Sequence, residues 1–268
     1  MYYEGTVASG VTMGTTLRSA KPTIRVRATK GPKQRGPRRP RKMDLETKTL
    51  PLQERSRGTF EAILRVAGEV LADKGADAFS MNEVCLRSGL SHPALYRYFP
   101  NKYAVLKALA QRLMDAGDDA VLSARSRCRL PQSERELIAE LRTVITELVR
   151  VTASFPGSVQ ILRALRARPE MRQVQLASTA RLAANRYERL RAMFPKADPE
   201  RLRRSVWLGL ETGNISMELV VEGAYAEGGA TAQATIDDAA VLLGRYYWRL
   251  GVQEDLQEGT GAKSPKRR

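Results

Sequence analysis

A short stretch in the first half of the chain gathers side chains that can bond to the edges of nucleic-acid bases. Three of them carry hydrogen-bond donors and two offer small apolar contacts. In chain order they are His92, Pro93, Ala94, Tyr96 and Arg97. Groups of these types read base pairs in the major groove of DNA. The stretch contains no acidic residue, so it can approach phosphate oxygens without charge repulsion.

The sequence lacks the residue types that most catalytic and metal sites require. His92 is the only histidine, and Cys85 and Cys128 are the only cysteines. A structural zinc site uses four such ligands, and no phosphate-binding glycine loop or nucleophile-elbow motif occurs. We therefore expect a chain that is not an enzyme and that uses no cofactor and no metal. Cys85 is expected to pack within its helix.

Two helices are expected before the base-reading stretch. Apolar residues recur at three- and four-residue steps from Phe60 to Leu71, which is the pattern of one buried helix face. Gly75 is expected to end this helix in a left-handed conformation. Ser80 and Glu83 have the spacing of a capping box and predict the start of a second, short helix.

A turn and a third helix complete the arrangement. Gly89 breaks the second helix, Ser91 is expected to cap the third, and Asn101 is expected to cap a fourth. Leu95 and Phe99 face inward and hold the third helix against the first. The sequence therefore predicts a helix-turn-helix whose third helix presents its outward face to the major groove.

Over about residues 57–110 the sequence resembles the DNA-binding domain of TetR-family regulators. The resemblance rests on the Gly-Leu-Ser turn at 89–91 and on Leu-Tyr-Arg-Tyr-Phe-Pro-Asn-Lys at 95–102. The chain departs from the family pattern at Cys85 and Ser88, where alanine is usual. The resemblance implies an N-terminal helix-turn-helix domain of three helices and a C-terminal helical domain for ligand binding and dimerisation.

The resemblance also implies roles for single side chains. It places Ser80 and Asn82 on phosphates, and Tyr98 and Lys102 on the DNA backbone as a clamp. The residues that it places in the major groove are His92, Pro93, Ala94 and Tyr96. Plainer alternatives remain, because Tyr96 and Tyr98 could be packing residues, and His92 and Lys102 could be ordinary surface residues.

The remainder of the chain also predicts helices. Capping residues at Ser133 and Asp198 each begin one, and apolar steps from Leu176 to Phe194 predict a long helix between them. No alternating strand pattern occurs, so the expected fold is all-α with about nine helices. We expect four segments: a disordered basic arm at 1–52, the helix-turn-helix domain at 53–112, a helical effector-binding and dimerisation domain at 113–252, and a disordered tail at 253–268.

The last two helices are the expected dimer interface. Gly209 and Gly213 lie four residues apart, where two helix backbones could approach closely. The last helix offers the large side chains Leu243, Tyr247 and Leu250. In the family that the chain resembles, the corresponding helices of two subunits form a four-helix bundle. The alternative is that these residues form a core within one chain.

A polar face on the helix after Asp198 is a candidate for effector binding. Trp207, Glu211 and Asn214 share that face of the helix. The face either points to solvent or lines a wet cavity, where the three side chains could contact a small molecule. Arg163 and Arg166 are weaker candidates.

The net charge of +16 is concentrated near the ends of the chain. Residues 18–42 hold eleven Lys and Arg and no acid, whereas residues 44–253 carry about +5. The arm at 35–42 could follow a minor groove, could be a solvated tail, or could precede a true start at Met43. Basic tails also leave open a second class of function, a protein that coats DNA non-specifically.

Together these features predict a sequence-specific regulator of transcription. The simplest form is a repressor that binds a palindromic double-stranded operator as a homodimer and is released by an unknown small-molecule effector. The sequence shows no signal-peptide pattern and no run of 18 apolar residues. We therefore expect a cytoplasmic protein without a membrane partner.

Overall fold

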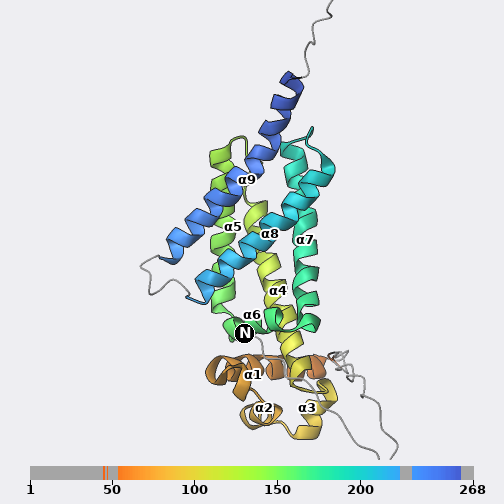
Figure 1. Ribbon diagram of the computed structural model, residues 1–268. Coiled ribbons are helices and arrows are strands. Elements are labelled where there is room, and N and C mark those ends of the chain that lie inside the picture. The colour runs from red at the N-terminus through yellow and green to blue at the C-terminus, as the bar shows by residue number, and fades with distance from the viewer. Residues whose placement is uncertain (1–44, 46, 48–53, 224–230, 261–268) are drawn as a thin grey trace, which may run out of the picture. The chain divides into compact units, whose positions relative to one another are not determined.

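The computed structural model describes residues 45, 47, 54–223 and 231–260, and every regular element in that part of the chain is an α-helix (Figure 1). The predicted all-α class is confirmed there. In chain order the helices are α1 (Glu54–Ala78), α2 (Met81–Ser88), α3 (His92–Tyr98), α4 (Lys102–Ser126), α5 (Glu134–Ser154), α6 (Ser158–Ala167), α7 (Pro169–Met193), α8 (Pro199–Val221) and α9 (Ala232–Thr260). None of the described helices has the length and hydropathy needed to cross a membrane.

Two of the expected segment boundaries fall inside helices. Helix α4 continues through residue 112, so no loop divides the expected domains there. Helix α9 runs to Thr260, so residues 253–260 are helical and the expectation of a disordered tail is wrong for them. Gln, Glu and Leu in that segment are good helix formers, although the apolar pattern stops at Leu250. Nearly all of the basic arm, Met43 and the last eight residues lie outside the described residues.

The caps of the first helices follow the sequence with two differences. The Oγ of Ser80 accepts a hydrogen bond from the N–H of Glu83 at 3.3 Å, as the capping box predicts. Gly75 interrupts α1 with φ 74° and ψ 174°, the positive φ that the sequence predicted, but helical residues resume after it and run to Ala78. Ser91 stands at the N-cap of α3 but its side chain makes no capping bond. Pro93 in the first turn has no N–H to donate, which removes one of the usual partners.

The first four helices, which we call the head, share one apolar core, the head core. It is built on the predicted stripe of α1 and on the inner faces of α3 and α4, including Ile63, Leu95, Phe99 and Val105. The same core continues into α6 and the start of α7. Helix α6 therefore packs directly on the helices that hold α3.

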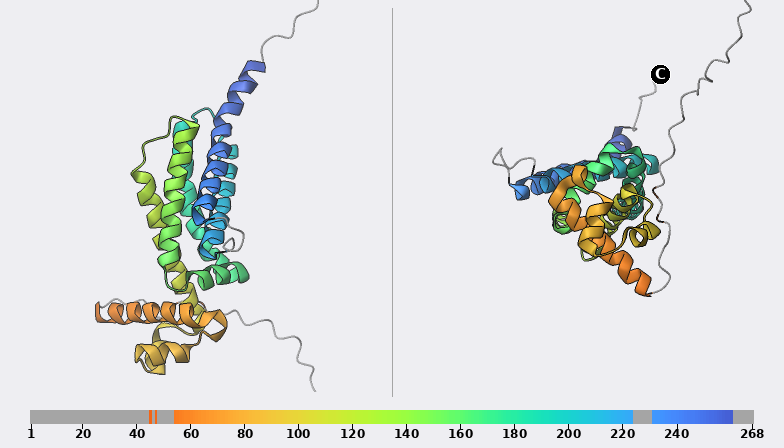
Figure 2. Two further views of the ribbon diagram at one scale, coloured as in Figure 1. Left: turned by 90° about the vertical axis from the view of Figure 1, so that its left-hand side faces the viewer. Right: turned by 90° about the horizontal axis from the view of Figure 1, so that it is seen from below.

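The long helices α4, α5, α7, α8 and α9 pack side by side, and we call them the bundle (Figures 1 and 2). Helices α4 and α5 are adjacent, α5 packs on α9, and α7 and α8 pack on each other. Buried side chains of α5, α7, α8 and α9 form a second core, which contains Leu137, Leu190, Leu202 and Ala240. On α9 the buried side chains extend from Ile236 to Leu250.

Candidate functional site

Helix α3 is held by buried residues on one face and exposes the other. Gly89 adopts φ 68° and ψ 11° between α2 and α3, a left-handed conformation that favours glycine. Leu95 and Phe99 are fully buried in the head core. The side chains on the opposite face of α3 are therefore fixed in place by the packing beneath them.

The five residues expected to read bases lie together on that face. His92, Pro93, Tyr96 and Arg97 are exposed, and Ala94 is half-buried. The rings of His92 and Tyr96 lie nearly parallel, with centroids 6.3 Å apart. Tyr96 keeps 40% of its surface exposed, an unusual amount for a large aromatic side chain. The structure thus presents donors and small apolar groups on one short helix.

Tyr98 differs from the expectation that it clamps the DNA backbone. Only 5% of its surface is exposed, and its ring lies 6.1 Å from the ring of Phe60 in the head core. The guanidinium carbon of Arg97 lies 5.8 Å from the centroid of the Tyr98 ring. These contacts favour the packing role that the sequence left open, because the buried ring presents little surface to a DNA backbone.

Lys102 and Ser80 are brought together at the start of two helices. The ammonium of Lys102 donates to the carbonyl of Phe79 at 3.4 Å, directly before the N-cap of α2. The lysine provides positive charge, and the helix N-terminus beside it provides backbone N–H groups. Together they can bind a phosphate. The hydroxyl of Ser80 accepts the capping bond and still has its own proton to donate. Asn82, in the first turn of α2, is exposed.

Exposed ion pairs fix α2 on α1. Arg87 pairs with Asp73 at 2.6 Å, and Lys74 pairs with Glu83 at 3.2 Å. The ammonium of Lys74, with Arg87, holds the pKa of Glu83 below its usual value. Burial raises the pKa of the Cys85 thiol, which suits the structural role expected for it.

The residues expected at a dimer interface are instead packed inside one chain. Leu243, Tyr247 and Leu250 have 5%, 1% and 4% of their surface exposed and belong to the second core. The phenol of Tyr247 occupies the space beside Gly209 where a Cβ would lie, and Gly213 faces Leu243. The alternative, a core within one chain, therefore describes these five residues: Gly209 and Gly213 lie against Tyr247 and Leu243, and Leu250 is buried in the same core.

The residues expected to bind an effector do not meet in one cavity. Trp207 is 39% exposed and lines a surface pocket of about 560 Å³ with Tyr187 and Arg203. Glu211 accepts a hydrogen bond from Thr179 at 3.2 Å, whereas Asn214 lines a separate internal cavity.

The two arginines proposed as weaker effector contacts are engaged in ion pairs. Arg166 pairs with Glu218 at 2.7 Å and with Glu222 at 2.9 Å, and Arg163 lies 3.6 Å from Glu222. These pairs join α6 to the end of α8. Burial raises the pKa of Glu218, and the charge of Arg166 acts against that rise.

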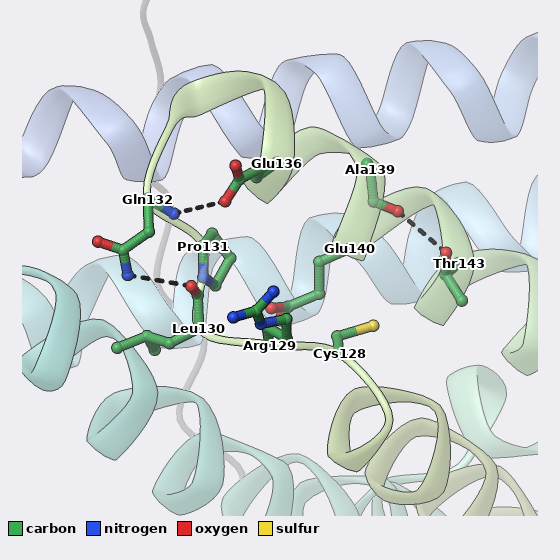
Figure 3. A pocket seen from close by; sticks show the side chains of 9 residues that line it. All are labelled: Cys128, Arg129, Leu130, Pro131, Gln132, Glu136, Ala139, Glu140 and Thr143. Atoms are coloured by element: carbon green, nitrogen blue, oxygen red, sulfur yellow. Dashed lines mark hydrogen bonds between the residues drawn. The ribbon is translucent and has the colours of Figure 1, made fainter.

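A surface pocket of about 730 Å³ lies beside the loop between α4 and α5 (Figure 3). Several of its polar groups are already paired. The backbone N–H of Gln132 donates to Glu136, the Gln132 amide donates to the carbonyl of Leu130, and the hydroxyl of Thr143 donates to the carbonyl of Ala139. The groups that make these bonds are therefore engaged within the protein before a ligand arrives.

The internal cavity contains functional candidates that sequence reasoning missed. It has a volume of about 50 Å³, lies among α4, α5, α7, α8 and α9, and is lined by Arg125 and Arg186 as well as by Asn214. Each arginine follows a buried apolar residue, Val121 or Leu182, by one helical turn. This four-residue spacing could have revealed them in the sequence, because a residue one turn after a buried residue lies on the same face of the helix and points inward.

Comparison with known proteins identifies the segment around α3. Residues 63–109 match the family described as bacterial regulatory proteins, tetR family. Over 82 residues the chain is 38% identical to the HTH-type transcriptional activator FasR of Mycolicibacterium smegmatis, which covers 31% of this chain and 36% of that protein. Over 54 residues it is 41% identical to the class C tetracycline repressor protein of Escherichia coli, which covers 20% and 25%. The chain thus spans about a third or less of these relatives' length.

Solved structures extend the likeness to the rest of the fold. A tetR-family transcriptional regulator from Streptomyces coelicolor superposes with a TM-score of 0.55 at 17% identity, over 76% of this chain and 96% of that one. A protein of unknown function from Rhodococcus sp. RHA1 gives the same TM-score and identity over 72% and 95%. At this identity the likeness concerns the fold. Residues 63–109 thus carry a helix-turn-helix segment like that of the tetR family of regulatory proteins, and the chain shares its all-helical fold with these solved structures.

Proposed function

We propose that this protein binds a palindromic DNA operator as a homodimer through α3 and that a small-molecule effector releases it. The observation that carries the proposal is the exposed face of α3. Donors and apolar groups of the types that read base edges stand there on a rigid apolar core. Lys102 and Ser80 lie beside that face and supply the phosphate contacts that fix register. Such a role places the protein in the cytoplasm with the DNA.

A dimer is part of the proposal because one helix-turn-helix reads only one half-site. With the glycine face of α8 used inside the chain, the opposite face is free for a partner subunit. Leu208 and Ile215 share that face, seven residues apart, and are 58% and 57% exposed. Leu242 on the neighbouring α9 is 58% exposed. Exposed apolar groups on two adjacent helices suit a two-fold contact of the four-helix type.

The dimer contact is tested by placing a charge on it. Ile215→Glu should shift the protein from dimer to monomer in sedimentation at micromolar concentration, because a buried lone carboxylate is costly at an interface. Leu86→Glu is the matched control, since Leu86 is 78% exposed on α2. A monomeric wild-type protein, or an Ile215→Glu dimer as stable as the wild type, would contradict this contact.

Release by an effector requires that movement in the bundle reach the head. Helix α6 belongs to the head core and is also tied to α8 by the ion pairs of Arg166. A ligand that prefers a different spacing of the bundle helices would therefore shift α6 and the two α3 helices of a dimer. The matched relatives include an activator and a repressor. Repression is the simpler form, since it needs only occupancy of the operator.

The proposed function is tested by selecting bound duplexes from random DNA with the full chain. We expect a palindromic consensus with half-sites about one helical turn apart. Absence of any enriched sequence, together with equal affinity for all duplexes and a steep salt dependence, would contradict the proposal. That result would instead indicate a protein that coats DNA through its basic tails.

A further inference from the structure

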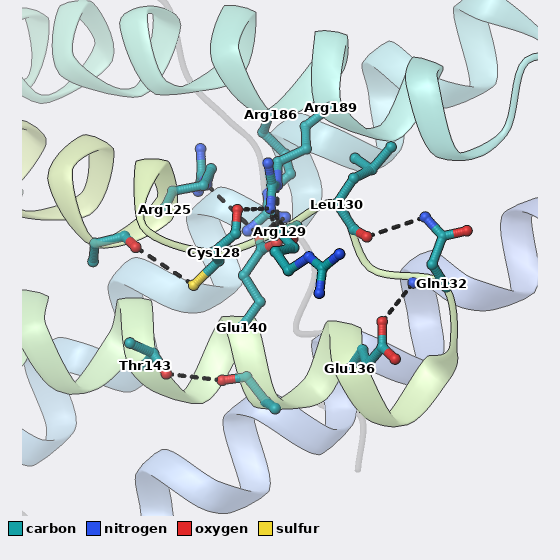
Figure 4. Close-up of polar contacts among 12 residues, drawn as sticks. Arg125, Cys128, Arg129, Leu130, Gln132, Glu136, Glu140, Thr143, Arg186 and Arg189 are labelled. Carbon is teal, nitrogen blue, oxygen red and sulfur yellow. Dashed lines mark hydrogen bonds and ion pairs between the residues drawn. The ribbon is translucent and has the colours of Figure 1, made fainter.

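A group of charged residues is buried in the bundle, far along the chain from α3. It consists of Arg125 on α4, Glu140 on α5, and Arg186 and Arg189 on α7 (Figure 4). Arg125, Glu140 and Arg186 have 3%, 4% and 1% of their surface exposed. Charged side chains are rarely buried to this extent unless each is fully paired.

The single carboxylate is already shared by two of the three arginines. Arg186 donates to Oε1 of Glu140 at 3.0 Å. Arg189 donates to Oε2 through two nitrogens, at 2.8 and 2.7 Å, and also bonds two backbone carbonyls. Both carboxylate oxygens therefore hold a close guanidinium partner.

Arg125 is left with incomplete compensation. Its Nε lies 3.9 Å from Glu140, its Nη1 donates to the side chain of Asn185 at 2.7 Å, and its Nε has no hydrogen-bond partner among the described residues. Burial, with repulsion from Arg186, lowers the pKa of Arg125 to about 9. Three cations thus face one anion, and a buried uncompensated charge costs several kcal/mol.

The internal cavity places this excess positive charge beside an apolar lining. Arg125, Arg186 and Tyr247 line one part of it. The residues one helical turn earlier on the same three helices are Val121, Leu182 and Leu243, and these also line it. On each of these three helices the polar residue follows the apolar one by four residues, roughly one helical turn, and one turn rises about 5 Å along the helix axis. The cavity therefore has a cationic part and, about one helical turn away, an apolar part.

We propose that this cavity is the effector site and that its ligand is a carboxylate with an apolar body, whose carboxylate pairs with Arg125 and whose body lies against Val121, Leu182 and Leu243. This inference rests on the proposed function, since it names the chemical class of the effector. A carboxylate supplies the missing negative charge and accepts hydrogen bonds in the geometry that a guanidinium offers.

The small size of the cavity gives the ligand a means of regulation. A volume of about 50 Å³ holds a few water molecules, whereas even a benzene-sized ligand needs about 150 Å³. The ligand's body therefore requires the helices around it to separate. A ligand that binds only the separated arrangement shifts the population toward it.

The test measures ligand binding to the full-length protein without DNA, by calorimetry and by thermal shift. The probes are decanoate and 2-naphthoate, each paired with its uncharged amide. We expect at least one carboxylate to bind, and to bind about tenfold to a hundredfold more tightly than its amide, the effect of one charge-assisted hydrogen bond. Binding of neither carboxylate, or equal binding of acid and amide, would overturn the proposal.

Variants locate the site. Arg125→Met should weaken carboxylate binding by a similar factor and leave amide binding unchanged, whereas Arg125→Lys should retain most of the preference for the acid. Arg142→Leu is the matched control, because Arg142 is exposed on α5 and pairs with Asp237 at 2.7 Å. Carboxylate binding that survives in Arg125→Met, or is lost equally in Arg142→Leu, overturns the assignment.

The outcome is separable from that of the proposed function. A protein that selects an operator but binds neither carboxylate fails this inference alone. A protein that binds the carboxylate through Arg125 but selects no DNA sequence fails the proposed function alone.

Discussion

The head and the bundle differ in whether charged side chains enter the core. In the head, charged pairs such as Arg87 with Asp73 lie at the surface, and the core beneath α3 is apolar. In the bundle, Glu140 and Arg186 pair at 3.0 Å with 2% of each side chain exposed. The head therefore owes its geometry to apolar packing, and a ligand can meet its polar groups from outside. The bundle has surface pairs as well, but it also buries a charged group that a ligand must enter the bundle to meet.

This difference predicts which substitutions alter stability and which alter binding. A surface pair contributes little to folding, whereas removal of one member of a buried group leaves the others uncompensated. Substitutions in the buried group should therefore change the free energy of unfolding, and substitutions on the exposed face of α3 should change affinity for DNA at constant stability.

The largest effect is expected for Glu140→Gln. Among the described residues Glu140 is the one carboxylate that faces the three arginines of the buried group, so we expect its removal to lower the free energy of unfolding by about 3–5 kcal/mol. Urea denaturation measures it. Glu147→Gln is the control, since Glu147 pairs with Arg150 at the surface of the same helix and should change stability little. Equal stability of the two variants would remove the contrast between head and bundle.

A smaller effect is expected where α8 meets α9. Gly209→Ala places a methyl group where the phenol of Tyr247 lies, so overpacking should cost about 1–3 kcal/mol. Gly213→Ala is its partner experiment. The nearest atom there is 3.7 Å away, and alanine should stabilise the helix by about 0.5–1 kcal/mol. If instead both substitutions destabilised the protein to the same degree, and the loss depended on protein concentration, the two glycines would belong to a contact between subunits.

The smallest effect concerns the edge of the head. Lys102→Ala should weaken binding to specific and non-specific DNA alike and reduce the slope of log affinity against log salt by about 1, because one phosphate contact is lost. Fluorescence anisotropy at several salt concentrations measures that slope. An unchanged slope would leave Lys102 as a residue that only supports the backbone at Phe79.

The same contrast explains what could be predicted from the sequence. The helices of the head were predictable because caps at Ser80 and Asn101, the turn at Gly89 and the apolar stripe of α1 all indicate one arrangement. Helix α7 was harder. Its predicted stripe included Leu176, which is 38% exposed, whereas its buried face includes polar residues. They are Gln175, Ser178, Thr179 and Arg186.

A search for apolar periodicity cannot detect a helix face that is buried and polar, so the cavity of the bundle was missed. The roles of Gly209 and Tyr247 could not be settled either. A small residue opposite a large one has the same pattern within a chain and between two chains.

The most direct test of the central claim compares wild-type protein with Tyr96→Ala on two duplexes, the selected operator and a scrambled sequence of equal length. Because Tyr96 is exposed and held by a rigid helix, we predict that Tyr96→Ala loses about 1–3 kcal/mol of affinity for the operator and none for the scrambled duplex, with unchanged stability. Equal losses on both duplexes, or no loss on either, would contradict the claim that α3 reads the sequence.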